Sequence, residues 1–508
     1  LQSVDYLPGL RSPFSPLNLC GAALPTRWWN PGLCWSWEWR KTAYFNQTCD
    51  VISSIPFFLG RPLFYTGSLN VTEQLLKAEG KSRLIKPPEL NRALLMWGEG
   101  VISANGETWK RHRRIVAPAF TSKTYSLVWQ ETAATYKEMV AGEGWESCRE
   151  ITITDSSRLT QKAGLYLRYH GHIMALIIIS RCGFGLHMPW VEAGTGELSF
   201  GDALTVVSQT HIARLITPRW AYKLPIKKLR DIDHAWSMLA TYMENFVQLK
   251  KDELSQVDQK DDTHQRGDIF TRLVAAHDGD GKYGLDKDEV IGNTFTLMFA
   301  GHETTANVLA ATLGYLGIHQ EEQHKAYEEI QSAISSDRNP TMEDAVNLPH
   351  TLACFLETLR LFPAGFAIMR DVTEDTLIQV SHPAERTMVL RKGSRMVIDM
   401  IGVHHDPKVF PEPRTYRPSR WYGVSEHDIP MFGIGPRACI GQKFARAEAL
   451  CFLVLLLRDW KVDVVLEEGE SRDRYEERVM GKAGLTGMAF GVTETISLKL
   501  ERRLQTVL

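Results

Sequence analysis

One cysteine stands in a loop suited to expose its sulfur to a bound group. Cys439 lies in Phe432-Gly-Ile-Gly-Pro-Arg-Ala-Cys-Ile-Gly441, directly before a strongly apolar stretch. A thiolate is costly to bury unless backbone N–H groups and a helix N-terminus stabilise it, and Gly435 and Gly441 let the backbone approach closely. Arg437 offers a guanidinium to an anionic group nearby. The pattern predicts a thiolate presented to a metal on a flat cofactor; the alternative is an ordinary buried cysteine.

A second segment whose residue types could take part in chemistry lies in the middle of a long predicted helix. Apolar spacing predicts a helix from Asp288 to His319, and Ala300-Gly-His-Glu-Thr-Thr305 occupies its middle. Glycine and threonine are poor helix formers, and a threonine hydroxyl that bonds to the carbonyl one turn earlier bends a helix. We expect a local bulge with room for a small ligand such as dioxygen. The alternative is a kinked, buried helix with a solvated glutamate.

Both segments resemble signatures of the cytochrome P-450 superfamily. The cysteine loop matches F-x-x-G-x-R-x-C-x-G at every fixed position, and the helical segment is similar to the oxygen-binding motif of the family's helix I. The resemblance implies heme b (iron protoporphyrin IX) with Cys439 as the axial thiolate of its iron. It implies that Glu303 belongs to a proton path and that Thr304 is the hydroxyl beside dioxygen. The loop residues that it places at the cofactor are Phe432, Gly435, Arg437 and Gly441.

Further residues resemble the groups that hold the haem propionates in this family. Trp109-Lys-Arg-His-Arg113 is similar to the W-x-x-x-R pattern of helix C, and residues four apart share a helix face. A Pro-Ala-Phe stretch follows, as is common in the family. Arg370, shortly after the predicted helix K, matches another family arginine. The resemblance implies that Trp109, Arg113 and Arg370 bind the propionates.

The spacing of Glu357 and Arg360 predicts an ion pair with a structural role. Residues three apart share a helix face, and the flanking residues 354–362 are mostly apolar, so we expect a buried pair. A buried pair needs further partners to offset desolvation. The segment is similar to the family's helix K motif, E-x-x-R, and Pro418-Ser-Arg-Trp421 resembles the segment that supplies the third partner, which nominates Arg420.

Composition and length set wider limits. The 508 residues are 44% hydrophobic and 23% charged, and the net charge of −2 gives no indication of nucleic acid binding. The eight cysteines show no C-x-x-C or regular spacing, which favours reduced thiols in a cytosol-facing protein over a zinc site or disulfide framework. Length alone suggests two or more domains. Because the motifs span 109–441 as in one P-450 unit, we expect residues 46–508 to form a single haem-thiolate monooxygenase domain.

Residues 1–45 form a Pro/Trp-rich segment whose composition bears on attachment to a membrane. Tryptophans gather at membrane interfaces, and the segment resembles the hinge that follows the anchor helix of microsomal members. No run of about 18 or more apolar residues occurs, and the chain starts at Leu1, so we expect any anchor upstream of it. The resemblance implies the cytosolic face of the endoplasmic reticulum membrane. The alternative is a soluble subdomain with aromatic packing.

The expected fold is mainly α with a small β portion, as in the cytochrome P-450 fold. Short strands are expected near 55–80, 377–380 and 388–398, and residues 120–250 are mostly helical in pattern. The run from Phe444 to Leu457 is apolar on nearly every side, which predicts a buried helix.

Residues 163–173 look like extra sequence relative to the family. Gly164 and Gly171 would weaken a continuous helix here. Extra residues survive best when they loop out to the surface, where added length costs little. We expect either a surface bulge or a retained intron.

The resemblance implies a haem-thiolate monooxygenase, of a fungal microsomal type and with a role in secondary metabolism. It would insert one oxygen atom from dioxygen into a small apolar organic substrate. No flavin or nicotinamide domain is apparent, so electrons are expected from an NADPH-cytochrome P-450 reductase docked on a basic proximal face. The basic residues nominated for that face are Lys110, Arg111, Arg114, Lys443 and Arg446.

The predicted pocket is apolar, which favours a lipid-like, terpenoid or aromatic substrate. The resemblance implies that the residues near its lining are Phe295, Phe299, Phe366, Ile368, Met369, Leu485 and Met488. Two other classes of function remain open. One is a P-450-fold dehydratase or isomerase, against which the Glu303–Thr304 pair argues, and the other is a non-enzymatic haem-binding sensor.

Overall fold

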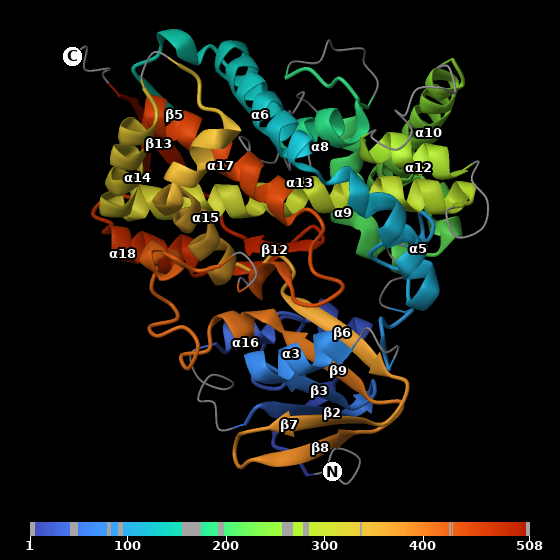
Figure 1. The fold of residues 1–508 in the computed structure, drawn as a ribbon. Coiled ribbons are helices and arrows are strands. Elements are labelled where there is room, and N and C mark those ends of the chain that lie inside the picture. The colour runs from blue at the N-terminus through green and yellow to red at the C-terminus, as the bar shows by residue number, and fades with distance from the viewer. Residues whose placement is uncertain are drawn as a thin grey trace.

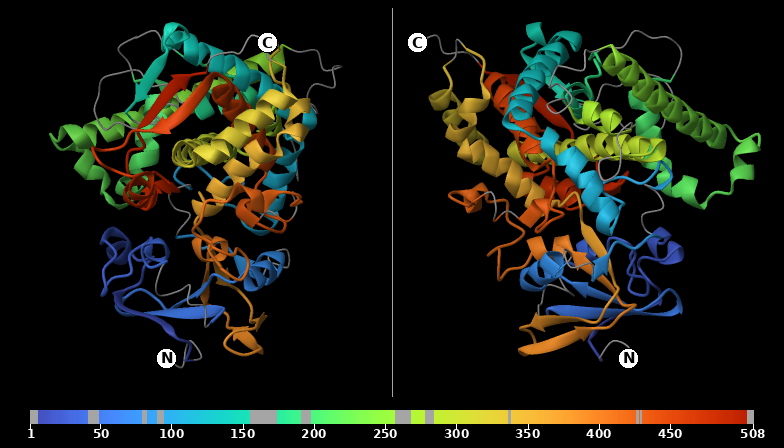
Figure 2. Two further views of the ribbon diagram at one scale, coloured as in Figure 1. Left: turned by 90° about the vertical axis from the view of Figure 1, so that its left-hand side faces the viewer. Right: turned by 45° about the vertical axis from the view of Figure 1, so that its right-hand side comes forward.

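Helices make up most of the chain, and a smaller strand-rich part lies at one end (Figure 1). In this computed structural model the described residues run from 6 to 503, apart from 41–48, 79–82, 90–94, 155–173, 191–197, 257–267, 278–283, 336–337, 426–427 and 429. The N-terminal end lies at the strand-rich end and the C-terminal end at the opposite, helical end (Figure 2). The expected class, mainly α with a small β portion, is confirmed.

The strand-rich part is built around a six-stranded sheet with the order β1-β2-β3-β9-β6-β4. Its strands are β1 (Gly9–Phe14), β2 (Val51–Leu59), β3 (Leu63–Thr66), β4 (Leu84–Ile85), β6 (Ala367–Val372) and β9 (Arg395–Asp399). The β1–β2 and β3–β9 pairs are parallel, and the other pairs are antiparallel. All five residues of β9 are buried, as suits a strand inside the sheet.

Smaller elements complete the strand-rich part. They are α3 (Leu69–Ala78), α16 (Met400–His404) and the hairpin of β7 (Thr376–Val380) and β8 (Arg386–Leu390). The predicted strands after residue 376 are thus present as β7, β8 and β9. The N-terminal elements are α1 (Leu19–Ala23) and α2 (Trp35–Glu38).

The helical part surrounds one long central helix, α13 (Lys287–Ile318), where the apolar spacing predicts it. Asp286 and Glu289 form a capping box at its start. The other helices of this part are α5 (Gly106–Val116), α6 (Ser122–Gly142), α8 (Met174–Phe184), α9 (Phe200–Ile216), α10 (Lys227–Ser255), α12 (Ile269–His277), α14 (Gln320–Ala333), α15 (Pro349–Leu361), α17 (Gln442–Asp459) and α18 (Arg472–Tyr475). Figure 1 shows α13 crossing the molecule, with α8, α15 and α17 against it.

Three short strand pairs join the helical part. β10 (Trp460–Val464) pairs with β13 (Leu498–Arg502), which also pairs with β5 (Glu150–Ile153). β11 (Ala483–Thr486) and β12 (Ala489–Val492) form a hairpin that packs on α13. Helix α17 is buried from Ala447 to Leu457, as its apolar sequence predicts.

The N-terminal segment is integrated into the fold where it is described. Strand β1 pairs with β2, and Trp35 and Trp37 are buried, whereas Trp28 is 90% exposed. Among the described residues, no helix combines the length and apolarity needed to cross a membrane. The proposed boundary near residue 45 and the extra sequence at 163–173 lie outside the described residues.

Candidate functional site

The loop that carries Cys439 is held from two sides. The Cys439 N–H donates to the Phe432 carbonyl oxygen at 2.8 Å, which closes the loop on itself. Arg113 Nη2 on α5 donates to the Ala438 carbonyl oxygen at 3.1 Å. Gly435 has a φ of +78°, and a Cβ there would lie 2.9 Å from the Leu76 carbonyl oxygen, so glycine is required. The loop is therefore fixed between α5 and the end of α3.

The Cys439 thiol lies in a recess. The residue is exposed to solvent, yet desolvation raises the pKa of the thiol, while the Gly441 N–H and Arg113 act to lower it. Protein atoms therefore surround the Cys439 thiol closely enough to desolvate it, but they leave one side of the residue open. Within the described part of the chain, no three His, Cys, Asp or Glu side chains gather as a metal cluster. A metal held by Cys439 would thus bring its other ligands with it.

Aromatic and basic side chains converge beside this recess. The Arg437 guanidinium lies 4.4 Å from the centroid of the Trp109 ring, in a cation–π contact. Trp109 and Arg113 are both half-buried on α5, so the two predicted residues of that helix lie beside the cysteine loop. Arg370 lies separately on β6, is 5% exposed and donates from Nη1 to the Met369 carbonyl oxygen at 2.7 Å.

Helix α5 is held against α13 by a buried polar cluster that the sequence analysis missed. The Glu289 carboxylate accepts from Arg111 and lies 3.1 Å from His112 Nε2. His112 Nδ1 is 3.1 Å from Asn293 Nδ2. Arg111 is thus committed to an internal contact, whereas Lys110 lies on the surface and pairs with the exposed Glu107 at 2.6 Å.

A half-exposed strip runs along the otherwise buried middle of α13. From Gly292 to Ile318 every residue is buried except Ala300, Gly301, Thr304 and Asn307. The spacing places Ala300, Thr304 and Asn307 on one face, which therefore borders open space inside the molecule. Thr304 Oγ1 donates to the Ala300 carbonyl oxygen at 2.9 Å, as predicted.

The glycine of this segment has a packing role. A Cβ at Gly301 would lie 2.7 Å from Ile179 Cγ1 of α8, so glycine permits close contact between two helices. The expected local bulge is not seen, because residues 300–305 remain α-helical throughout.

Glu303 is buried rather than solvated. Its side chain is 1% exposed, and its carboxyl oxygens accept from the Met488 N–H at 3.2 and 3.3 Å. Desolvation raises the pKa of Glu303 to about 8, and the Met488 N–H opposes the shift only in part. Glu303 therefore holds its proton at neutral pH. The carboxyl faces the turn between β11 and β12.

Two further residues at this turn were missed by the sequence analysis. Asn307 Nδ2 donates to Thr486 Oγ1 at 2.7 Å, one helical turn beyond Glu303. The turn itself contains Gly487, and Gly491 follows in β12. Glycines inside a strand pattern indicate close approach of another element, and this was the available signal.

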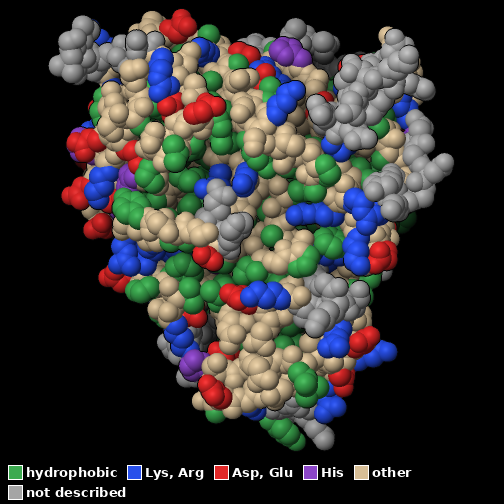
Figure 3. All heavy atoms as spheres, in the orientation of Figure 1, with side chains coloured by type: hydrophobic (Ala, Val, Ile, Leu, Met, Phe, Trp, Pro, Cys, Tyr) green, Lys and Arg blue, Asp and Glu red, His purple; other side chains and the backbone are tan. Residues whose placement is uncertain are grey.

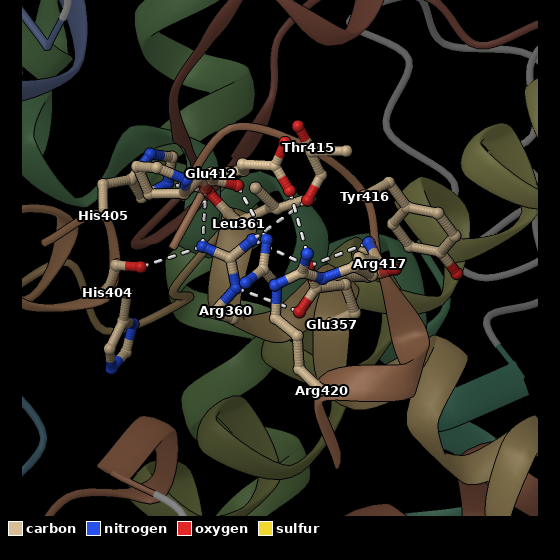
Figure 4. A network of polar contacts seen from close by, with 12 residues as sticks. Glu357, Arg360, Leu361, His404, His405, Glu412, Thr415, Tyr416, Arg417 and Arg420 are labelled. Carbon is tan, nitrogen blue, oxygen red and sulfur yellow. Dashed lines mark hydrogen bonds and ion pairs between the residues drawn. The ribbon is translucent and has the colours of Figure 1, made fainter. Parts of the chain in front are cut away.

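The Glu357 network is shown in Figure 4. Glu357 and Arg360 are both fully buried and paired through two bonds of 2.8 and 2.9 Å. Arg420 Nε reaches the same carboxylate at 3.1 Å, which confirms the predicted third partner. Trp421 Nε1 and the Arg417 N–H also donate to it, both at 3.0 Å. Arg360 additionally donates to the carbonyl oxygens of His404 and Pro413.

The predicted pocket residues divide into two groups. Phe295 is 1% exposed and stacks between Trp97 and Phe299, with ring centroids 5.0 and 6.1 Å away. Phe295 thus supports the wall from behind, and Phe299 is buried as well. The half-buried members are Phe366, Ile368, Met369, Leu485 and Met488.

Known proteins similar to this chain share one family. The sequence model of the family described as Cytochrome P450 matches residues 41–483. Cytochrome P450 monooxygenase 124 of Postia placenta is 30% identical over 489 residues, covering 94% of this chain and 90% of its own. Cytochrome P450 4F12 of Homo sapiens is 30% identical over 411 residues, covering 78% and 74%. A crystal structure of a Cytochrome P450 (CYP102L1) is similar in fold, with a TM-score of 0.67, 18% identity, and 92% and 96% coverage.

Proposed function

The chain belongs to the cytochrome P450 family and is a haem-dependent monooxygenase, and we propose that it oxidises a small apolar organic substrate with electrons from an NADPH-cytochrome P-450 reductase. The single observation that carries this proposal is the recessed Cys439 thiol in a loop fixed beside Arg113, Arg437 and Trp109. The apolar character of the half-buried pocket residues supports the substrate class.

The residues present fit heme b, the cofactor of this family. The loop keeps its sulfur accessible, and Gly435 lets the loop pack closely on the Leu76 carbonyl oxygen at the end of α3, which fixes the position of the loop. Cys439 would bind the iron, and the Gly441 N–H and Arg113 would stabilise its thiolate. When bound, the haem supplies the activation of dioxygen and the transfer of one oxygen atom. Trp109, Arg113, Arg370 and Arg437 would hold the propionates through charge-assisted and N–H donors, with Phe432 and Gly441 completing the loop.

We assign proton handling to Thr304 and Glu303. Thr304 lies on the half-exposed strip, and its hydroxyl donates back to the Ala300 carbonyl oxygen, which leaves its oxygen able to accept a hydrogen bond. Glu303 is protonated at neutral pH because its pKa is about 8, and a group with such a pKa suits a general acid. Its carboxyl faces the β11–β12 turn, so proton transfer to Thr304 would require a water or a side-chain rotation.

Electron supply and membrane contact complete the proposal. Arg114 and Lys443 are exposed near the cysteine loop, and basic side chains gather over α5 on the face in Figure 3, which suits an acidic reductase surface. From the end of α9 to the start of α10, Ile216, Trp220 and Ile226 are 51%, 65% and 48% exposed beside basic residues. An apolar, basic segment of this kind favours an anionic membrane surface, here the cytosolic face of the endoplasmic reticulum.

Replacement of the thiolate tests the proposal directly. The reduced, carbon monoxide-bound protein should show the strongly red-shifted Soret band of a thiolate-ligated haem. Cys439→Ser should abolish that band, whereas Cys148→Ser, at a half-buried cysteine of another segment, should keep it. Persistence of the band in Cys439→Ser would refute the assignment.

Removal of the Thr304 hydroxyl tests proton handling. Thr304→Ala should retain haem but divert reducing equivalents from product to peroxide, since general acid–base steps contribute roughly 100- to 10,000-fold. Thr305→Ala is the matched control, because its hydroxyl also bonds back one turn, to Gly301, but is buried. Equal peroxide yield per NADPH in wild type and Thr304→Ala would remove Thr304 from the proposed path.

A further inference from the structure

Two polar contacts tie the central helix to the turn between β11 and β12. Asn307 Nδ2 donates to Thr486 Oγ1 at 2.7 Å, and the Thr486 hydroxyl donates onward to the Ala489 carbonyl oxygen at 3.4 Å. The second contact joins the Glu303 carboxyl to the Met488 N–H. Glu303 and Asn307 are four residues apart and therefore share a helix face. We call these two contacts the hairpin latch.

The hairpin is shaped to receive these two side chains. A Cβ at Gly487 would lie 1.8 Å from Glu303 Oε1, and one at Gly491 would lie 3.3 Å from Asn307 Cβ, Cγ and Nδ2. Gly487 has a φ of +83° at the first position of a two-residue turn, which glycine favours. Each glycine thus removes the atom that would push one latch side chain away.

The latched turn borders the same open space as Thr304. Asn307 belongs to the half-exposed strip with Ala300 and Thr304. On the hairpin, Leu485 and Met488 flank the turn and are half-buried. Farther along, β12 is anchored elsewhere, because the Phe490 N–H donates to the Ala364 carbonyl oxygen at 3.0 Å and its ring lies 5.6 Å from Phe366. The position of the turn itself therefore depends on the latch.

We propose that Asn307, through Thr486, is a positioning residue that fixes the 486–488 turn as a wall of the substrate pocket and so sets how a ligand lies against the oxygen site. This inference rests on the proposed function, because it assigns the pocket to a substrate. Neither residue touches the reacting atoms. The contact between Asn307 and Thr486 instead holds Leu485 and Met488 at a defined distance from Thr304.

The test compares four single variants with the double variant Asn307→Leu/Thr486→Val. Thr486→Val removes the acceptor at nearly constant volume, Asn307→Leu removes the donor, and Thr486→Ser restores the hydroxyl. Thr495→Val is the control at an exposed threonine of the segment that follows the hairpin. Amide hydrogen exchange of the peptide 483–492 reports the turn directly, without turnover. Binding of imidazole and of 4-phenylimidazole, followed in the haem spectrum, reports the cofactor and the pocket wall respectively.

We expect Thr486→Val and Asn307→Leu to accelerate exchange in 483–492 about tenfold and to change the dissociation constant of 4-phenylimidazole about threefold or more, as expected for the loss of one hydrogen bond. Imidazole binding should stay unchanged in every variant, and Thr486→Ser and Thr495→Val should resemble wild type. The double variant should be no worse than either single one. Wild-type exchange in both single variants, or additive losses in the double variant, would overturn the inference. Failure of wild type itself to give a thiolate-haem spectrum would instead refute the proposed function.

Discussion

Glu357 and Glu303 are both buried on largely apolar helices, yet their surroundings differ in kind. Glu357 on α15 is fully buried and accepts from two arginines, a tryptophan and a backbone N–H (Figure 4). Glu303 on α13 is 1% exposed and meets one backbone N–H, that of Met488. Burial raises the pKa of Glu303 to about 8. The two buried carboxyl groups therefore differ in the number and the charge of their hydrogen-bond donors.

The difference explains why one site is structural and the other suits chemistry. A buried carboxyl group that accepts from several charged donors ties together the chain segments that supply them. A carboxyl group with a single neutral donor keeps its proton instead, because the charged form would remain desolvated. The first arrangement joins α15 to residues 404–421, and the second places a carboxyl group against the Met488 N–H of the β11–β12 turn.

Loss of Glu357 should have the largest effect. Glu357→Ala leaves Arg360 buried without its carboxylate, which costs about 3–5 kcal/mol and should strongly reduce the yield of haem-loaded protein. Glu328→Ala, at a 65% exposed glutamate of α14, should change the free energy of unfolding by less than about 1 kcal/mol. Denaturant unfolding and the carbon monoxide difference spectrum measure both quantities. A stable, fully loaded Glu357→Ala protein would show that the network is dispensable.

Spacing within one helix was predictable from the sequence, and contacts between distant segments mostly were not. The Glu357–Arg360 pair follows from residues three apart, and Arg420 follows from a motif resemblance. The His404 and Pro413 carbonyl contacts depend on the path of the chain between α16 and Trp421, which no local pattern specifies.

The same distinction holds in the candidate site. Helix α13 and the Thr304 back-bond follow from local sequence. The direction of Glu303 does not, because its partner Met488 comes 185 residues later in the chain. The inward orientation of the Arg111 side chain does not follow from local sequence either, because its partner Glu289 lies 178 residues away. Side chains with a choice of distant partners were therefore the ones whose placement the sequence left open.

A pH-dependent change in stability should test the surroundings of Glu303. An acid whose pKa is higher in the folded state than its ordinary value of 4.5 binds more protons when folded, so it lowers the folding stability as pH rises from 4.5 to about 8. Glu303→Gln removes this penalty while keeping an acceptor for the Met488 N–H. The variant should gain up to about 2–3 kcal/mol of stability relative to wild type between pH 5.5 and 7.5.

Denaturant unfolding at these two pH values measures the gain, with Glu328→Gln as the exposed control. A stability difference between Glu303→Gln and wild type that does not change with pH would mean that Glu303 is ionised when folded. The contrast with Glu357 would then rest on contacts alone.

Arg417 offers the smallest and most selective test of the comparison. It lies within the network of Figure 4, but it bonds Glu357 only through its backbone N–H, at 3.0 Å. Its guanidinium pairs with Glu412 at 2.8 Å, and the two side chains are 41% and 65% exposed. Arg417→Ala should therefore lower the free energy of unfolding by no more than about 1 kcal/mol, as for other exposed ion pairs, and should leave haem loading intact. Arg420→Ala, whose side chain is 6% exposed and reaches Glu357 directly, should cost clearly more in the same unfolding experiment. Equal losses in the two variants would show that proximity to the network, rather than direct and buried contact with the carboxylate, determines what each arginine contributes.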